Sequence, residues 1–559
     1  MGFLDQAVIV ALGLRGAKRQ NPNYVAIESE MGPTLKRRIF RNYLLICGIA
    51  AHAGLALGLV AHAVFLTEYE IGEIVGKARS RFSNDHPAIS RAATRLLTIL
   101  TIPTQKTPKT ETLPPFPGPA KWPMHGVIRS GLSEQLYDPK GTPLQSAATQ
   151  PGFAPSARQI LVNDTQSLLQ AVRNAKAGDA ITLQPGTYLV KGRRISLGAD
   201  GLPHAPIYVR ARQFGEVVLE LDMLEGFFVD KSYWVFENLK IRGACADDSN
   251  CEHAFHVFGP AIGSVIRNNE LVDFNAALKV NGDRGGGRER FPDYGLVQNN
   301  NLYNTRPRRT SNPSTPLNIN SGNGWVVSAN FIADFSKGRG NRVSYAAFMK
   351  GNSEGGIFER NLVVCHWRLP LDGDIRLGLS FGGGGTGDQF CRSGNCETEH
   401  TGGIIRNNVI ARCPVDVGIY LNRAAQTQIH NNLLIANAGI DVRFETSSAS
   451  IHNNIVDGRI RDRDGGIHYA DNNLISAECN LLSRWFGSCS PNDWLYAPLA
   501  GDLRLRDGAQ IVDKGNIEPR GTADFCGTVR KGTPDIGPIE YGLEPPCLPG
   551  HTAADISTR

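Results

Sequence analysis

Six short segments in the second half of the chain share an alternation that would align basic, amide and aromatic side chains on one surface. Every second residue is apolar and would face a core, so the residues between them would point outward. The segments are ALKVNG (277–282), PLNINS (316–321), AAFMKG (346–351), GLSFGG (378–383), GIYLNR (418–423) and GIDVRF (439–444). Stacking them produces one row of Lys279, Asn318, Phe348, Ser380, Tyr420 and Asp441, and a second row of Asn281, Asn320, Lys350, Gly382, Asn422 and Arg443.

These two rows have the chemistry of a groove for an extended, acidic sugar chain. Amides and hydroxyls bind sugar hydroxyls, an aromatic ring packs on a sugar ring, and cations bind carboxylate or sulfate. With strands ~4.8 Å apart, the rows would extend over about 25 Å. The alternative is an ordinary solvated sheet face, but such faces are rarely so poor in carboxylates. The pattern therefore favours a ligand groove.

The element that must position these strands is a repeat. A phrase with an asparagine or an asparagine pair followed by apolar residues recurs, with its last Asn at 269, 300, 330, 361, 408, 432, 454 and 473. The steps of 31, 30, 31, 47, 24, 22 and 19 residues indicate a solenoid. Its units are short strands rich in Val, Ile, Leu and Phe, and no unit holds a long helical period. Asparagine tolerates positive φ at corners, and stacked corners would join their amides in a ladder.

Residues 167–188 (SLLQAVRNAKAGDAITLQPGTY) predict an amphipathic helix, a turn, a strand and a second turn. This segment resembles the start of pectin-lyase-like right-handed parallel β-helices, in which a helix caps the open end of the solenoid. The phrase GTPDIGPIEYG (532–542) resembles the end of such domains. The resemblance implies an all-β, right-handed parallel β-helix over residues 158–542.

The region around Lys350, FMKGNSEGGIFERNLV, with IRLG at 375–378, resembles the catalytic region of the polysaccharide lyases that include chondroitinase B and alginate lyases. The resemblance implies β-elimination, with Lys350 as the base that removes the proton α to a uronate carboxylate. Arg376 would stand by the leaving oxygen or the carboxylate. Such a base needs a lowered pKa, which Arg376, Arg423 or Arg443 would provide by charge repulsion.

One departure from that family concerns calcium. The stretch NRVSYAAFMK lacks the acidic residues that hold the ion in those lyases, so no metal ligands are assigned. Asn281, Asp283 and Asn320 are alternative calcium ligands, and Lys350 as a plain surface lysine is the competing interpretation. A uronan C5-epimerase would use the same proton abstraction. A non-catalytic module that binds or guides an exopolysaccharide is the alternative from another class.

Hydrolysis by paired carboxylates is a weaker alternative, because it needs two close outward acids. The strands offer Asp441, and the long step at 371–400 offers Asp372, Asp374, Asp388, Glu397 and Glu399. That same segment holds four consecutive glycines at 382–385, which would let a ligand approach the backbone. It matches neither common nucleotide-binding motif.

The chain before the solenoid predicts a membrane anchor. Residues 43–66 contain no formal charge over 24 residues, are preceded by Lys36, Arg37, Arg38 and Arg41, and are followed by acids. The positive-inside rule then places residues 1–42 in the cytoplasm and the solenoid in the periplasm or outside the cell. Residues 67–157 would form a helical stalk and a proline-rich linker, and 543–559 a C-terminal tail. Because +4 of the net charge of +6 lies in residues 1–42, nothing indicates nucleic-acid binding. No oligomeric state follows from the sequence.

Ten of the 11 cysteines lie beyond the predicted anchor, and an even number suggests disulfides in an oxidising compartment. The close pairs are Cys245/Cys251, Cys391/Cys396, Cys479/Cys489 and Cys526/Cys547, which leaves Cys365 and Cys413 on neighbouring coils. A metal site formed by Cys391, Cys396 and His400 is the alternative for one pair, although its spacing fits no common zinc pattern.

Overall fold

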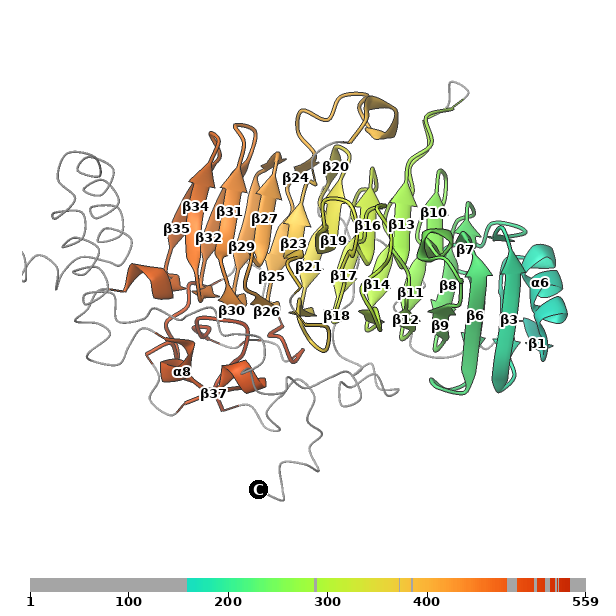
Figure 1. Cartoon of the computed structure of the whole chain (residues 1–559), viewed down its shortest axis with the longest axis horizontal. Coiled ribbons are helices and arrows are strands. Elements are labelled where there is room, and N and C mark those ends of the chain that lie inside the picture. The colour runs from blue at the N-terminus through green and yellow to red at the C-terminus, as the bar shows by residue number, and fades with distance from the viewer. Residues whose placement is uncertain are drawn as a thin grey trace, which may run out of the picture.

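Three long parallel sheets wind together into one elongated solenoid, as Figure 1 shows for a computed structural model. The structure describes residues 158–285, 289–370, 372–383, 386–479, 490–506, 510–517, 523–527, 530 and 532–542. Within this part of the chain no helix is long and apolar enough to cross a membrane, and the predicted span 43–66 lies outside it. The predicted segments 1–42, 67–157 and 543–559 also lie outside the described residues.

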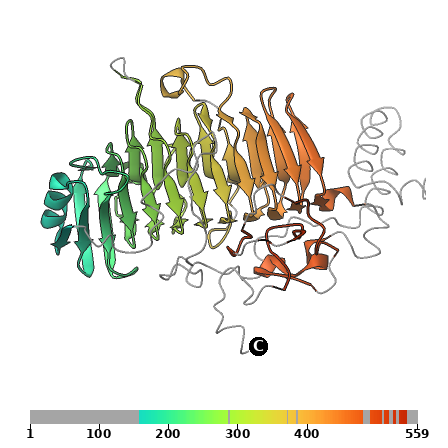
Figure 2. The ribbon, with the colours of Figure 1, turned by 180° about the vertical axis from the view of Figure 1, so that it is seen from behind.

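Each coil places one strand in each sheet. In one coil, β11 (Val265–Arg267) leads through an asparagine corner to β12 (Glu270–Val272), then through a loop to β13 (Leu278–Asn281). The next coil starts with β14 (Leu296–Gln298), which pairs in parallel with β11. The prediction of a parallel β-helix is therefore confirmed, and its successive coils are visible from both sides (Figures 1 and 2).

The first sheet also contains β1 (Arg158–Val162), β2 (Asp179–Leu183), β5 (Ile207–Ala211), β8 (Trp234–Glu237), β17 (Val326–Ser328), β21 (Ile357–Glu359), β25 (Ile404–Arg406), β29 (Thr427–His430), β32 (Ser448–His452) and β35 (Ile467–Asp471). The second also contains β3 (Gly186–Gly192), β6 (Val217–Met223), β9 (Lys240–Gly243), β15 (Asn301–Tyr303), β18 (Phe331–Ala333), β22 (Leu362–Val364), β26 (Val409–Cys413), β30 (Leu433–Asn437), β33 (Ile455–Val456) and β36 (Leu474–Ile475).

The third sheet, which forms the floor of the candidate site, also contains β4 (Ile195–Ser196), β7 (Glu225–Val229), β10 (His253–Phe258), β16 (Leu317–Asn320), β19 (Val343–Lys350), β23 (Ile375–Phe381), β27 (Ile419–Asn422), β31 (Gly439–Arg443) and β34 (Arg459–Arg463). A small sheet of β20 (Ser353–Glu354), β24 (His400–Thr401) and β28 (Ala424–Ala425) lies beside it.

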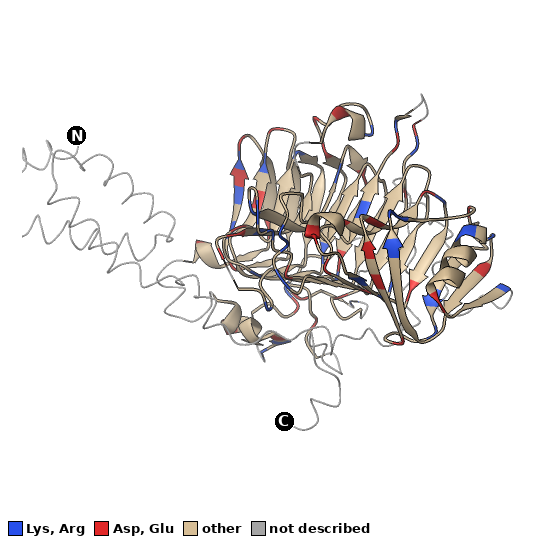
Figure 3. Ribbon diagram, turned by 45° about the vertical axis from the view of Figure 1, so that its right-hand side comes forward, with Lys and Arg blue, Asp and Glu red and all other residues tan. Residues whose placement is uncertain are grey.

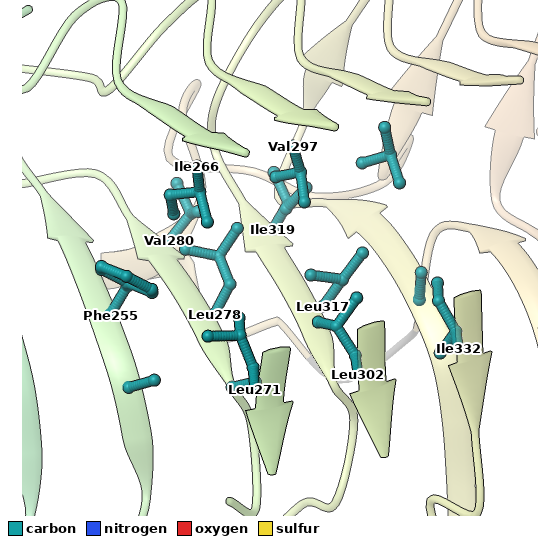
Figure 4. Close-up of a cluster of buried hydrophobic side chains, with 14 of the residues drawn as sticks. Phe255, Ile266, Leu271, Leu278, Val280, Val297, Leu302, Leu317, Ile319 and Ile332 are labelled. Carbon is teal, nitrogen blue, oxygen red and sulfur yellow. The ribbon is translucent and has the colours of Figure 1, made fainter. Parts of the chain in front are cut away.

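The inside of the solenoid is a continuous apolar core. Leu278 and Val280 of one coil pack next to Leu317 and Ile319 of the next (Figure 4), and all four are fully buried. Helix α6 (Thr165–Asn174) closes the N-terminal end with Leu168 and Val172 inside, as the sequence predicted. Its first turn is capped by the Asp164 side chain, which accepts a hydrogen bond from the Ser167 amide.

The C-terminal segment lies outside the solenoid and covers part of the outer face of the second sheet. Helix α8 (Pro491–Trp494) and the hairpin of β37 (Leu495–Ala497) and β38 (Asp502–Leu505) contribute Trp494 and Leu503 to a cluster with Leu362, Val409 and Leu433 of the second sheet. The described solenoid strands thus end at β36, and residues 490–506, followed by residues such as Ile511, Phe525 and Ile536, pack against the second sheet.

The two adjacent positions of each asparagine phrase have different structural roles. The first residue of each phrase has positive φ, for example 56° at Asn268 and 52° at Asn407. The second residue, buried in every phrase except the last (Asn473), forms the predicted ladder: Asn361 donates from Nδ2 to Asn408 Oδ1 at 2.9 Å, and its own Oδ1 accepts from Asn330 Nδ2 at 3.0 Å. The ladder runs through all eight predicted asparagines, 269 to 473.

Ala329 interrupts an outer row of asparagines at a left-handed corner. Its φ is 53°, which is unfavourable for alanine, whereas Asn299 and Asn268 at the equivalent corners are joined by a side-chain hydrogen bond. We expect Ala329→Asn to stabilise the protein by about 0.5–1 kcal/mol in thermal or urea unfolding. Ala329→Val should instead destabilise it, because a β-branched residue resists positive φ. Equal effects of the two variants would contradict this account.

His400 is a fully buried, neutral histidine. Its ring lies 4.1 Å from that of Phe381, its Nε2 accepts a hydrogen bond from the Gly356 amide, and burial lowers its pKa to about 3. The unfolded chain binds this proton near pH 6.5 and the folded chain does not, so stability must fall below pH 6.5 by about 1.4 kcal/mol per pH unit for this group. We expect His400→Phe to make the free energy of unfolding less dependent on pH by about 1.4 kcal/mol per pH unit. Urea unfolding measured from pH 7 to pH 4 tests this. An unchanged slope would show that another group is responsible.

Candidate active site

The strand register aligns the two predicted rows on the outer face of the third sheet. In the first row Lys279 pairs with Asn318, Asn318 with Phe348, Phe348 with Ser380, Ser380 with Tyr420 and Tyr420 with Asp441. In the second row Asn320 pairs with Lys350 and Asn422 with Arg443, and the same register places Asn281 and Gly382. The predicted alignment of both rows is confirmed.

A long insertion encloses this surface on one side. Its disulfide Cys391–Cys396 holds a loop that is fixed to earlier coils by Arg392, which pairs with Asp293 at 2.6 Å. Ser321 donates to the backbone oxygen of Phe390. The insertion is the loop with a short helical turn beside β20 and β24 in Figure 1. Asn318, Asn320, Phe348, Ser380 and Tyr420 of the two rows are at most 6% exposed. The rows are thus largely covered and are not an open solvated sheet face.

Two lysines occupy neighbouring parts of this floor. Lys279 on β13 donates from Nζ to Asn318 Oδ1 at 2.9 Å. Burial, with the positive charge of Lys350 second, lowers the pKa of Lys279 to about 7, although Glu252 opposes the shift. Lys350 lies two strands further along and two residues beyond the position in register with Lys279, about 12 Å away by strand spacing and rise. An amine with a pKa near 7 can act as a general base at neutral pH.

Lys350 Nζ lies 5.0 Å from the centroid of the Phe348 ring. Burial lowers the pKa of Lys350, and the negative charge of Glu399 opposes that shift. The prediction that Lys350 has a lowered pKa therefore agrees with the structure, but its cause is burial rather than Arg376, Arg423 or Arg443. Figure 3 shows how Lys, Arg, Asp and Glu are distributed over the coils.

Each lysine faces a carboxylate on the wall of the site. Glu252, which follows η6 (Asp248–Asn250), accepts from Asn275 Nδ2 at 3.0 Å and from Asn312, and burial raises its pKa. Glu399, at the end of the insertion, is 1% exposed and accepts from the Gly351 amide at 2.9 Å and from the Thr386 hydroxyl. Among the described residues neither lysine forms an ion pair with these acids.

Arg376 does not lie in this site, which corrects the prediction that it stands beside Lys350. It pairs in register with Ser344, six residues before Lys350 on the neighbouring strand, hence about 20 Å away along the strand. Its guanidinium is 1% exposed, pairs with Asp374 at 2.6 Å and Asp334 at 3.8 Å, and donates to the Cys365 carbonyl. Arg376 therefore fixes the loop after β22 and cannot reach a substrate at Lys350.

The predicted residues at the C-terminal end of the rows are engaged with one another. Asp441 is fully buried between Arg461 and Arg463, at 2.7 and 2.6 Å, so it is not a free hydrolytic acid. Arg443 pairs with Asp464 and donates to the Tyr420 hydroxyl, which also accepts from Asn422 Nδ2 at 3.4 Å. Arg423 lines a cavity of about 570 Å³ together with insertion residues such as Thr386 and Glu397. Asp441 and Arg443 are thus held by partners within this end of the rows.

The alternative metal sites are not supported by the donors present. Asp283, one alternative calcium ligand, pairs with Arg290 and accepts from the Gly285 amide, and Asn320 Oδ1 accepts from Ser321. Cys391 and Cys396 form a disulfide, so the metal site with His400 is wrong. In the described part of the chain no three His, Cys, Asp or Glu side chains are grouped as a metal site.

The cysteine pairing follows the prediction where the structure describes both partners. Cys245–Cys251 and Cys365–Cys413 are disulfides, the latter between neighbouring coils. Cys479 and Cys526 are also disulfide-bonded, with partners outside the described residues.

The first row extends one coil further toward the N-terminus than the sequence predicted. His256 on β10 pairs in register with Lys279 on one side and with Phe228 on β7 on the other. The segment HAFHVF has the same alternation as the other strands, with buried Phe255 and Val257 on either side of the histidine. That alternation was the signal that could have extended the row by one coil.

The chain matches curated proteins over a short segment alone. No family model matches the chain. Over 95 residues the chain is 30% identical to pectate lyase L of Dickeya chrysanthemi, and equally to that of Dickeya dadantii (strain 3937), a match covering 15% of this chain. The chain thus spans about a fifth of the length of the curated relatives it matches (22%).

Solved structures with a similar course of the backbone include pectate lyase Pel9A, with a TM-score of 0.49, 15% identity and coverage of 70% of this chain and 98% of that one. The mannuronan C-5 epimerase AlgE4 A-module of Azotobacter vinelandii has a TM-score of 0.35 at 15% identity, with 58% and 94% covered. A rhamnogalacturonan lyase has 0.39 at 12%, with 56% and 83% covered. The predicted resemblance to β-helical polysaccharide lyases is confirmed. At these identities the resemblance concerns the fold.

Proposed function

We propose that this protein is a polysaccharide lyase that cleaves a uronate-containing glycan by β-elimination. The observation that carries the proposal is the pair of lysines with lowered pKa values, Lys279 and Lys350, on a largely covered sheet face that also presents the amides of Asn318 and Asn320. Elimination needs a base for the weakly acidic proton α to the carboxylate and a positive charge to stabilise the carbanion that forms. Two neighbouring amines, one neutral and one charged, meet both needs.

The environments of the two lysines support different roles. Lys279, with a pKa of about 7, is largely unprotonated at slightly alkaline pH, and its bond to Asn318 orients the amine. It is the better base. Lys350, which faces the charge of Glu399, is the cation for the uronate carboxylate. In this assignment Lys279 takes the role of base that the family resemblance implied for Lys350. In this proposal Asn281 and Asn320 bind sugar hydroxyls, and Phe348 packs on a sugar ring.

We further propose that the protein acts outside the cytoplasm and is anchored through residues 43–66. The disulfides within the solenoid support an oxidising compartment. An anchored enzyme would act on a polymer at its own cell surface.

The test is an elimination assay with the full-length protein. Polygalacturonate, polymannuronate, polyguluronate and chondroitin sulfate would each be incubated with it, and ultraviolet absorbance of the new C4–C5 double bond followed. We expect absorbance to rise with one class of polymer and to rise far more slowly with Lys350→Met. A flat trace with all four, together with C5 inversion seen by nuclear magnetic resonance, would indicate an epimerase. A flat trace with binding alone would indicate a binding module.

The pH dependence of the reaction provides a second test of the lysine pair. The base must be unprotonated, so kcat/KM should rise with pH through about 7, where Lys279 loses its proton. Lys350→Met removes a positive charge that lowers the pKa of Lys279, so this limb should move to higher pH in the residual activity of the variant. If this limb stayed at the same pH in the variant, the charge of Lys350 would not influence the pKa of Lys279. That result would contradict the assigned roles.

A further inference from the structure

A histidine–carboxylate pair lies on the floor of the groove next to the proposed base. His256 Nδ1 lies 2.9 Å from Glu225 Oε1, and Arg194 lies 3.7 Å from the other oxygen of that carboxylate. The hydrogen bond to His256 is the main cause that lowers the pKa of Glu225, which keeps it ionised. An ionised carboxylate at Nδ1 fixes the ring orientation and holds a proton on that nitrogen.

The other ring nitrogen of His256 is unused by the protein. Nε2 is buried and has no hydrogen-bond partner, and the imidazole is 14% exposed between the rings of Phe228 and Phe258. A buried polar atom without a partner is costly and calls for an explanation. Because His256 is the register neighbour of Lys279, the two side chains start about 4.8 Å apart on adjacent strands.

We propose that His256 is the general acid that protonates the leaving oxygen, with Glu225 as its positioning residue. This inference rests on the proposed β-elimination. The neutral amine of Lys279 takes the proton from C5, the C5–H electron pair forms the C4–C5 double bond, and the C4–O4 bond breaks. The departing O4 takes the proton from Nε2 of the doubly protonated imidazolium form of His256, whose Nδ1 proton stays hydrogen-bonded to Glu225. The enzyme then holds one more proton on Lys279 and one fewer on His256, and exchange with water restores both.

The geometry favours His256 over the other groups that could donate this proton. C5–H and C4–O4 are on adjacent carbons, so acid and base must lie within a few ångströms of one another, which excludes Arg376. Glu252 also lies near Lys279 and burial raises its pKa, but its Oε1 is already held by the side-chain amides of Asn275 and Asn312, which oppose that shift. His253 is held neutral, because burial lowers its pKa to about 3, and its Nδ1 lies against the Ala276 carbonyl.

The experiment compares two leaving groups in His256→Gln. The first substrate is whichever of the four polymers the wild type cleaves, whose sugar alkoxide needs a proton. The second is the matching hexuronate with 4-nitrophenol on O4, whose phenolate departs without one. We expect the variant to lose about 10²–10³-fold in kcat on the polymer and less than about 10-fold on the aryl substrate. Glu225→Gln should show the same pattern more weakly. His468→Gln, which removes a histidine paired with Asp462 outside the groove, is the matched control and should change neither rate.

The possible outcomes separate the two proposals. If the wild type eliminates and His256→Gln does so at the same rate on the polymer, the acid assignment fails and the lyase proposal stands. Equal losses on both substrates, with wild-type thermal stability, would show a role in binding and would also overturn the assignment. If the wild type eliminates neither substrate, the lyase proposal fails and the role of His256 fails with it.

Discussion

Replacing Lys279 with methionine is expected to lower kcat/KM for the cleaved polymer by about 10³-fold, the range typical for loss of a general base. Methionine has a similar length and keeps the packing, but it cannot accept the C5 proton. The folded protein should not be weakened, because the lysine amine is held in a poorly solvated place that lowers its pKa to about 7. Initial rates across polymer concentrations, together with a thermal melt, measure both effects.

Lys337→Met is the matched control for this substitution. Lys337 is also buried, donates to an asparagine side chain (Asn341, 2.9 Å) and has a pKa lowered by burial, but it lies in the loop between β18 and β19. Its removal should leave kcat/KM within about 3-fold of wild type, as expected for a residue outside the site. If Lys279→Met retained wild-type activity while Lys350→Met did not, the base would be Lys350, and the roles implied by the family resemblance would be restored.

Local patterns in the sequence were sufficient to predict the coils, because the physics behind them is local. An asparagine such as Asn268 is readable as a left-handed corner, and the spacing of Asn269 and Asn300 defines a coil. Alternation then determines which residues face outward, so Lys279 and Lys350 were correctly placed on one surface. The walls could not be predicted in this way, since Glu252 and Glu399 come from loops whose path depends on long-range contacts.

Arg376 shows why alternation alone misplaces a residue. Arg376 and Ser380 are four residues apart on β23, so their side chains point to the same face of the sheet, and Ser380 lies in the first row. Arg376 is nevertheless about 13 Å nearer the loop that precedes the strand. Its partners Asp334 and Asp374 belong to different coils, so their convergence is a tertiary property. The pKa of Lys279 has the same origin: it depends on enclosure by loops and on Lys350, two coils away, which no short motif records.

Asn361→Ala is expected to destabilise the protein by about 3 kcal/mol or more, because it breaks the asparagine ladder at its centre. Asn361 Oδ1 accepts from the Asn330 backbone amide at 3.0 Å, and its Nδ2 donates to the Val327 carbonyl at 2.9 Å. Both groups are buried in the solenoid and would lose these partners, at about 1–3 kcal/mol for each unsatisfied group. The midpoint of urea unfolding, compared at constant m-value, measures the loss.

Asn473→Ala at the last rung provides the comparison that isolates burial. Its side chain makes the same kinds of bond, accepting from the Asn454 amide at 3.0 Å and donating to the Ile451 carbonyl at 2.8 Å, but it is partly exposed. Water can replace those bonds, so the expected cost is about 1 kcal/mol. Equal losses at the two positions would mean that the ladder acts through its corners and not through its buried amides. A much larger loss at Asn361 would show that the stacked amides hold adjacent coils, and with them Lys279 and Lys350, in register.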